Sequence, residues 1–116
     1  MTKTIKYNLE ERTLKFANNV ADVLRKLPKD TINLEYIKQL VRSSGSVGAN
    51  YIEASEALSK KDFLMRIKIS RKEAKESIYW LKLLKNNGNS QVALNQLIQE
   101  AEELKKIFSS ILEKSL

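Results

Sequence analysis

Apolar and polar residues alternate along this chain with a helical period in four successive segments. In each segment the apolar side chains recur at intervals of three and four residues, which places them on one face of an α-helix. The inward positions are Leu9, Phe16, Val20, Val23 and Leu27 in the first segment, Ile37, Leu40, Val41, Ser44, Val47, Tyr51, Ser55 and Leu58 in the second, Phe63, Ile67, Ser70, Ala74, Ile78, Leu81 and Leu84 in the third, and Leu94, Leu97, Ala101, Leu104, Phe108 and Ile111 in the fourth. The pattern therefore predicts four amphipathic helices.

Caps and helix breakers mark the ends of these segments. Asn8 is a good N-cap, and Glu11 three residues later can complete a capping box. Pro28 ends the first helix, because the residue before a proline is pushed out of the helical region. The other boundary signals are Thr31 to Asn33 at the start of the second helix, Ser59 at the start of the third, Asn86-Asn87-Gly88-Asn89 at its end and Ser90 at the start of the fourth.

Short connections between the segments predict that neighbouring helices are antiparallel. The expected fold is an all-α, up-down-up-down four-helix bundle that occupies residues 1–116 as a single domain. The low content of helix breakers agrees with it, since 116 residues contain one Pro and three Gly. The second and third helices are each expected to run for about 25 residues, or about 38 Å.

A stretch rich in Ser, Gly and Ala between Arg42 and Glu53 allows two interpretations. As a loop it would divide the chain, and Gly45 and Gly48 each cost about 1 kcal/mol in a helix interior. A phosphate-binding loop would need a Gly-Lys-Ser/Thr ending, which is absent here. As a helix it keeps the apolar spacing on both sides, and we favour this interpretation.

In the helical interpretation the stretch has a second face with small residues where surface Lys and Glu are usual. Small side chains allow another backbone to approach, and a terminal Arg can reach a carboxylate on a neighbouring subunit. The alternative is a solvated face that happens to be small. We predict a subunit interface formed by Arg42, Ser46, Ala49, Asn50 and Glu53.

Positive charge is concentrated in two parts of the chain. The net charge is +7, and residues 60–85 contribute nine basic and three acidic residues, a net of +6. Residues 1–29 contribute +4, whereas the second and fourth helices are each about −1. A helical wheel predicts an outer stripe on the third helix, in which lysines can meet phosphates and a tyrosine can stack on a base. Its members are Lys61, Lys68, Lys72, Lys75, Tyr79 and Lys82, and the alternative is a stripe that serves solubility alone.

The residue types present argue against catalysis. The chain has no Cys and no His, which excludes disulfides, thiolate metal sites and the commonest general base. A di-iron bundle needs Glu-x-x-His on two helices, so Glu73 and Glu76 do not fit that pattern. We interpret these two carboxylates as ion-pair partners of Arg42, or of Arg66 and Arg71. No catalytic residue, metal or cofactor is expected.

The distribution of apolar residues also bears on location. No apolar run approaches the roughly 20 residues of a membrane span. Residues 1–7 are polar and lack the apolar core of a signal peptide. The expected location is the cytoplasm, with no membrane partner.

Two motifs resemble those of a known family. Arg42-Ser43-x-x-Ser46-Val47-Gly48-Ala49-Asn50 followed by Glu53-Ala54 resembles the signature of bacterial four-helix-bundle proteins encoded within 23S rRNA intervening sequences. Lys61-Asp62-Phe63 and Glu73-Ala74-x-Glu76-x-x-Tyr79-Trp80-Leu81 are similar to that family's third helix, and the resemblance covers about residues 9 to 112. The chain departs from the family at Tyr51 and lacks the Glu-Gly pair that often follows Glu53.

The resemblance implies an antiparallel four-helix bundle that assembles as a ring-like homopentamer, with no established enzymatic activity. A related branch includes the accessory variability determinant of diversity-generating retroelements, a basic bundle that binds nucleic acid and a reverse transcriptase. Two functions are therefore expected for the chain. The first is a non-enzymatic homo-oligomer that binds RNA or DNA through the basic stripe, and the second is a scaffold or adaptor whose partner is another protein.

Overall fold

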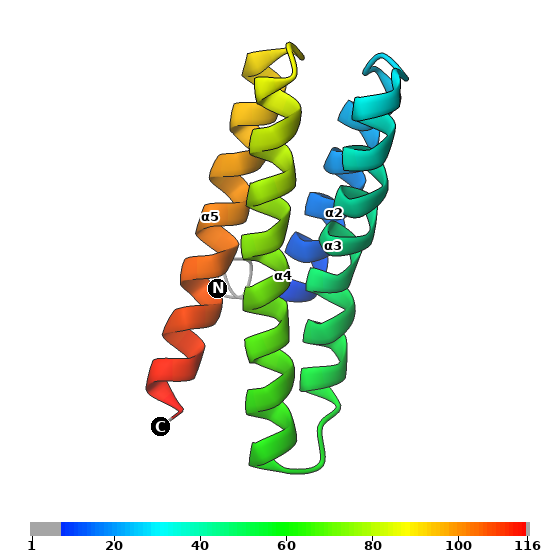
Figure 1. Cartoon of the computed structure of the whole chain (residues 1–116). Coiled ribbons are helices and arrows are strands. Elements are labelled where there is room, and N and C mark those ends of the chain that lie inside the picture. Colours follow the sequence, from blue (N-terminus) through cyan, green and yellow to red (C-terminus); the bar gives the residue numbers. More distant parts are fainter. Residues whose placement is uncertain (1–7, 116) are drawn as a thin grey trace.

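The computed structural model describes residues 8–115, which form four α-helices (Figure 1). Their bounds are α2, Leu9–Arg25; α3, Thr31–Ser55; α4, Lys60–Asn86; and α5, Gln91–Lys114. Figure 1 shows that consecutive helices run in opposite directions, so the all-α up-down-up-down bundle predicted from the sequence is confirmed. The prediction that residues 1–7 lack a signal peptide lies outside the described residues.

Two of the predicted N-caps, Asn8 and Ser59, form their capping hydrogen bonds. Asn8 Oδ1 accepts a hydrogen bond from the Glu11 N–H at 3.2 Å, and Ser59 Oγ accepts one from the Asp62 N–H at 3.1 Å. Gly88 takes a positive φ of 82° between α4 and α5, as a C-terminal stop signal requires. Ser90 occupies the N-cap position of α5, but its side chain makes no capping hydrogen bond. Asp30 caps α3 instead of a residue inside the predicted start, accepting from the Asn33 N–H at 2.8 Å.

Three inward positions predicted for the second helix are wrong, since Val41, Ser55 and Leu58 are all exposed. The helix ends at Ser55, and Leu58 lies in the connection to α4 with 98% of its surface exposed. The helix cannot continue, because Ser59 must adopt extended backbone (φ −142°, ψ 158°) to cap α4. Val41 is 55% exposed, since it faces the outer side of the contact between α2 and α3 and not the core.

The stretch from Arg42 to Glu53 is helical throughout, which confirms the helical interpretation. Its serines contribute to the contact with α4. Ser43 Oγ and Ser77 Oγ, both buried, lie 2.9 Å apart, and Ser70 Oγ donates to the Val47 carbonyl at 2.9 Å. Small hydroxyl side chains allow the two helix backbones to lie close together while every buried polar group keeps a partner.

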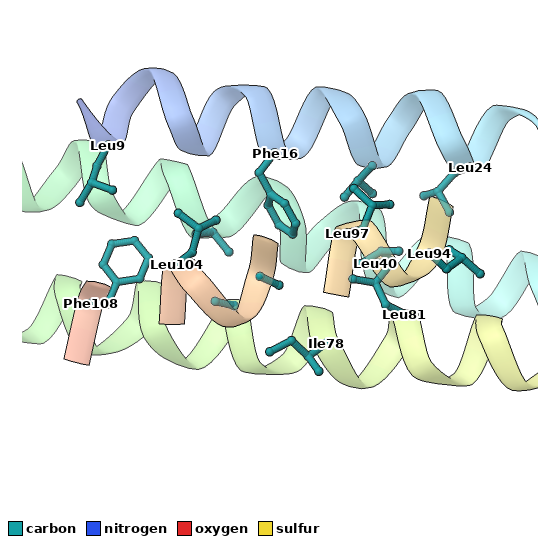
Figure 2. Packing of buried hydrophobic residues seen from close by; sticks show 14 of the residues in the cluster. Leu9, Phe16, Leu24, Leu40, Ile78, Leu81, Leu94, Leu97, Leu104 and Phe108 are labelled. Atoms are coloured by element: carbon teal, nitrogen blue, oxygen red, sulfur yellow. The ribbon is translucent and has the colours of Figure 1, made fainter. Parts of the chain in front are cut away.

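The core runs along the axis of the bundle (Figure 2). Phe16 from α2, Leu81 from α4 and Leu104 and Phe108 from α5 are each 1% exposed or less, and Figure 2 shows their side chains pointing between the helices. The helix α2 has 17 residues and the other three have 24 to 27, so α2 covers only part of the bundle's length. The principal extents are 44 × 29 × 19 Å.

Gly48 of α3 lies close against Thr13 of α2, and we expect Gly48→Ala to destabilise the fold. An added Cβ would lie 2.8 Å from Thr13 Oγ1 and 3.0 Å from Thr13 Cβ. Thr13 cannot easily move aside, because it is buried and donates a 2.7 Å hydrogen bond to the Leu9 carbonyl. The expected loss in the free energy of unfolding is about 1–3 kcal/mol, measured by urea denaturation.

Gly45 provides the matched control for this substitution. Nothing lies within 4 Å of a Cβ added there, so Gly45→Ala should stabilise the helix by about 0.5–1 kcal/mol. Equal effects of the two substitutions would contradict the close approach at Thr13.

Candidate nucleic-acid interface

The outer face of α4 carries a regular row of exposed residues at alternating spacings of four and three. We call it the α4 lysine face, and it consists of Lys61, Met65, Lys68, Lys72, Lys75, Tyr79, Lys82 and Asn86. All eight residues are exposed. Lys61 and Lys82 are about 32 Å apart along the helix axis at 1.5 Å per residue. The structure thus places all six residues of the predicted stripe on one surface, and adds Met65 and Asn86.

The two carboxylates in the middle of α4 point away from this face and bind α3. Arg42 Nη1 donates to Glu73 Oε1 at 3.3 Å, and Arg42 Nη2 donates to Glu76 Oε2. Glu73 is buried, with 8% of its surface exposed. The predicted ion pairing of these glutamates with Arg42 is confirmed, and it lies within one chain.

The surroundings of Arg42 favour the charged form of its guanidinium. Burial alone would lower the pKa of Arg42, but the charges of Glu73 and Glu76 and their hydrogen bonds outweigh it and raise the pKa. A guanidinium is protonated throughout the accessible pH range in any case. Arg42 therefore offers its positive charge to both glutamates at every pH at which the bundle is folded.

As a result, the positive charge of α4 is not balanced by nearby carboxylates. Within residues 8–115, none of the ion pairs involves a lysine or arginine of α4. Arg66 donates to the Asn50 amide oxygen at 2.9 Å, a neutral acceptor. The alternative prediction paired Glu73 and Glu76 with Arg66 and Arg71, and the structure does not show that pairing. The lysines of α5 differ, since Lys105 and Lys106 each pair with a glutamate one turn earlier.

Tyr79 is the outermost of three aromatic rings that cross from α3 to the α4 lysine face. Its ring centroid is 5.1 Å from that of Trp80 in an edge-on arrangement, and Trp80 lies 6.1 Å from Tyr36 of α3. Trp80 Nε1 donates to Glu76 Oε2 at 3.1 Å, and the half-buried Trp80 packs against the edge of the core. Tyr79 itself is 57% exposed.

The five residues of the predicted subunit interface do not share one environment in the structure. Asn50 Nδ2 donates to Ser46 Oγ at 2.9 Å, and Asn50 Oδ1 accepts from Arg66 of α4 at 2.9 Å. Both Ser46 and Asn50 are half-buried. Arg42 is engaged by the glutamates of its own chain. Ala49 and Glu53 are exposed. Of the five residues, these last two have no hydrogen bond within the described part of the chain that would have to be broken on assembly.

An open apolar groove lies between α2 and α3, beside Ala49. This α2–α3 groove has a volume of about 610 Å³, and its lining includes Thr13, Leu14, Ala17, Gly45, Ala49 and Ile52. A smaller hollow of about 230 Å³ continues it past Ala21 and Val41. Leu14, Val41 and Ile52 are each exposed by more than two fifths of their surface.

The sequence contained a signal for this groove, but the helical period of the apolar residues did not reveal it. The signal is the spacing of Ala17 and Ala21 on α2 opposite Gly45 and Ala49 on α3, since small residues on two facing helices leave a depression between them. Val41 was placed among the inward positions because it keeps the three- or four-residue spacing. That spacing also fits residues at the edge of a wide apolar stripe, which need not face the core.

Two further properties of the described residues bear on the class of protein. Within residues 8–115, no group of three or more Asp and Glu residues is arranged to hold a metal ion. No helix of this described region is both long enough and apolar enough to cross a bilayer.

These features define the chain as a small, basic four-helix-bundle protein with one lysine-rich face and one apolar groove. A family model described as 23S rRNA-intervening sequence protein matches residues 6–110, and the chain belongs to that family. A crystal structure of a protein of unknown function from the S23 ribosomal protein family of Bacteroides thetaiotaomicron is similar, with a TM-score of 0.82 and 31% identity. The match covers 89% of this chain and 96% of that one. No curated protein matches the chain. The predicted relation to the accessory variability determinant stays a prediction.

Proposed function

We propose that the chain is a non-enzymatic, homo-oligomeric protein of the cytoplasm that binds the phosphate backbone of RNA or DNA through the α4 lysine face. The observation that carries the proposal is the uncompensated charge of this face. A helix with nine cations would ordinarily use its own glutamates as partners at i, i+4 spacing. Here Arg42 of α3 takes both central glutamates, and the lysines remain available to an external anion.

The mode of binding follows from the residue types on the face. Lysine ammonium groups act as point charges on phosphates and do not read base edges. The backbone term of such binding comes from the release of counterions, so the affinity should fall as salt rises. Sequence preference is expected to be weak, because Asn86, at the end of the face, is its one amide side chain able to pair bidentately with a base.

For the homo-oligomer we propose a contact that includes Ala49 and Glu53 and extends into the α2–α3 groove. Exposed apolar patches on small proteins commonly mark interaction sites. The lining of the groove includes small residues, which allow a helix to approach closely. Five subunits are expected from the family resemblance.

The second candidate is a scaffold or adaptor that binds another protein, and the same groove favours it. Light scattering of the purified chain, with and without a mixed RNA pool at low salt, separates the two. The nucleic-acid proposal predicts an oligomer whose mass rises when RNA is added. An unchanged mass at low salt, together with a protein partner that co-purifies through the groove, would select the adaptor.

A further inference from the structure

Tyr79 is an exposed aromatic residue on the α4 lysine face. Tyr79 lies between Lys75 and Lys82, four residues after one and three before the other, so cations flank the ring on the same helix face. More than half of its surface is exposed. A tyrosine exposed to this extent contributes little to the core, yet its ring is held in place by the contact with Trp80.

The support behind the Tyr79 ring is unusually well fixed for a surface residue. Trp80 packs against Tyr36 on one side and donates its indole N–H to Glu76, and Glu76 is bound by Arg42. The ring thus rests on a chain of contacts that reaches α3. A platform whose orientation is fixed before binding loses less conformational entropy when it is stacked on.

Among the parts of a nucleic acid, only an unpaired base can stack on an aromatic ring that lies between cations. In a duplex the faces of the bases are covered by their neighbours, and a protein reaches only the phosphates, the sugars and the edges in the grooves. In a single strand the base faces are open, and stacking on aromatic side chains is sequence-tolerant. A purely electrostatic surface would instead favour the duplex, whose charge density is higher.

We propose that Tyr79 is a stacking platform for an unpaired base, so that the α4 lysine face binds single-stranded RNA or DNA in preference to duplex. This inference rests on the proposed function, because the lysines must hold the backbone for the base to reach the ring. Lys75 and Lys82 are about 10 Å apart along the helix axis and would contact the phosphates on either side of the stacked nucleotide.

Trp80 is the only tryptophan of the chain and reports directly on this site. The protein is titrated with a labelled single-stranded oligonucleotide of mixed sequence, and separately with the same strand annealed to its complement. Both titrations are done at low salt and at equal phosphate concentration. The two readouts are the fluorescence of Trp80 and the anisotropy of the labelled strand. The expected result is that the single strand binds about tenfold more tightly and changes the Trp80 emission, whereas the duplex binds without changing it.

Three variants assign the preference to the ring. Tyr79→Ala should lose about tenfold in affinity for the single strand and leave the duplex affinity unchanged. Tyr79→Phe, which keeps the ring, should behave as the wild type. Lys75→Gln should weaken both forms alike, and a single strand made of abasic sites should not distinguish Tyr79→Ala from the wild type. Circular dichroism verifies that each variant is folded, as expected at exposed positions.

The possible outcomes distinguish a failure of the stacking platform from a failure of the proposed nucleic-acid binding. Duplex binding equal to or tighter than single-strand binding would overturn the stacking platform and leave the proposed function standing. The same holds if Tyr79→Ala weakens both forms equally or neither. If neither form binds at low salt, the proposed function fails, and the stacking platform fails with it.

Discussion

Reversing Lys68, Lys72 and Lys75 to Glu should abolish nucleic-acid binding, with a loss of roughly a hundredfold or more at low salt. The three residues occupy the centre of the α4 lysine face and are all exposed, so the substitutions replace three phosphate contacts with three repulsive charges. The bundle should remain folded, because none of the three side chains takes part in a hydrogen bond or ion pair within residues 8–115. Anisotropy of a labelled single strand measures the loss.

A matched variant separates the position of the charges from their sum. Lys38→Glu, Lys106→Glu and Lys114→Glu change the net charge by the same amount, from +7 to +1, at exposed positions on α3 and α5. This control should keep most of the affinity. If the two triple variants lose affinity equally, binding follows the net charge and the α4 lysine face is not the site.

Ala49→Arg should convert the assembled protein into a folded monomer of 13.3 kDa. Ala49 is exposed at the edge of the α2–α3 groove, so a long cationic side chain there would block an approaching helix without disturbing the core. Ser46→Trp is a less clean test, because Ser46 is half-buried and hydrogen-bonded to Asn50. Light scattering coupled to size exclusion measures the mass, and circular dichroism verifies the helical content.

Gln99→Arg is the control for this substitution, since Gln99 is an exposed residue of α5 outside the groove. It should leave the mass of the assembly unchanged. A wild type that is already monomeric would refute the homo-oligomer, and an Ala49→Arg variant that keeps the wild-type mass would place the interface elsewhere.

The sequence was sufficient to predict the bundle because every helix is marked by its apolar period, and α2 and α4 are also marked by their N-caps. Asn8 and Ser59 carry their capping hydrogen bonds, and the inner residues of α5 from Leu94 to Phe108 are buried as predicted. The error at Leu58 arose because an apolar residue in phase with a helix does not show whether the backbone continues to it. The cap that Ser59 forms ends the helix first.

The six residues of the predicted basic stripe could be placed from the sequence, whereas the partner of the two central glutamates of α4 stayed open between Arg42 and the arginines of that helix. Position on a single helix follows from 100° per residue, so the exposure of Lys68 and Tyr79 could be read directly. The capture of Glu73 by Arg42 depends on how α3 and α4 are aligned, a relation that no single helix contains. The groove beside Ala49 depends in the same way on the contact of Gly48 with Thr13.

The salt dependence of binding tests the central claim most directly. The affinity of the wild type for a labelled single strand is measured over a series of salt concentrations, and the logarithm of the binding constant is plotted against that of the salt. Five lysines that each contact a phosphate predict a slope of about −3 to −4, since each contact on a single strand contributes about −0.7. A slope near zero, or no binding at the lowest salt, would contradict the claim that the α4 lysine face binds the nucleic-acid backbone.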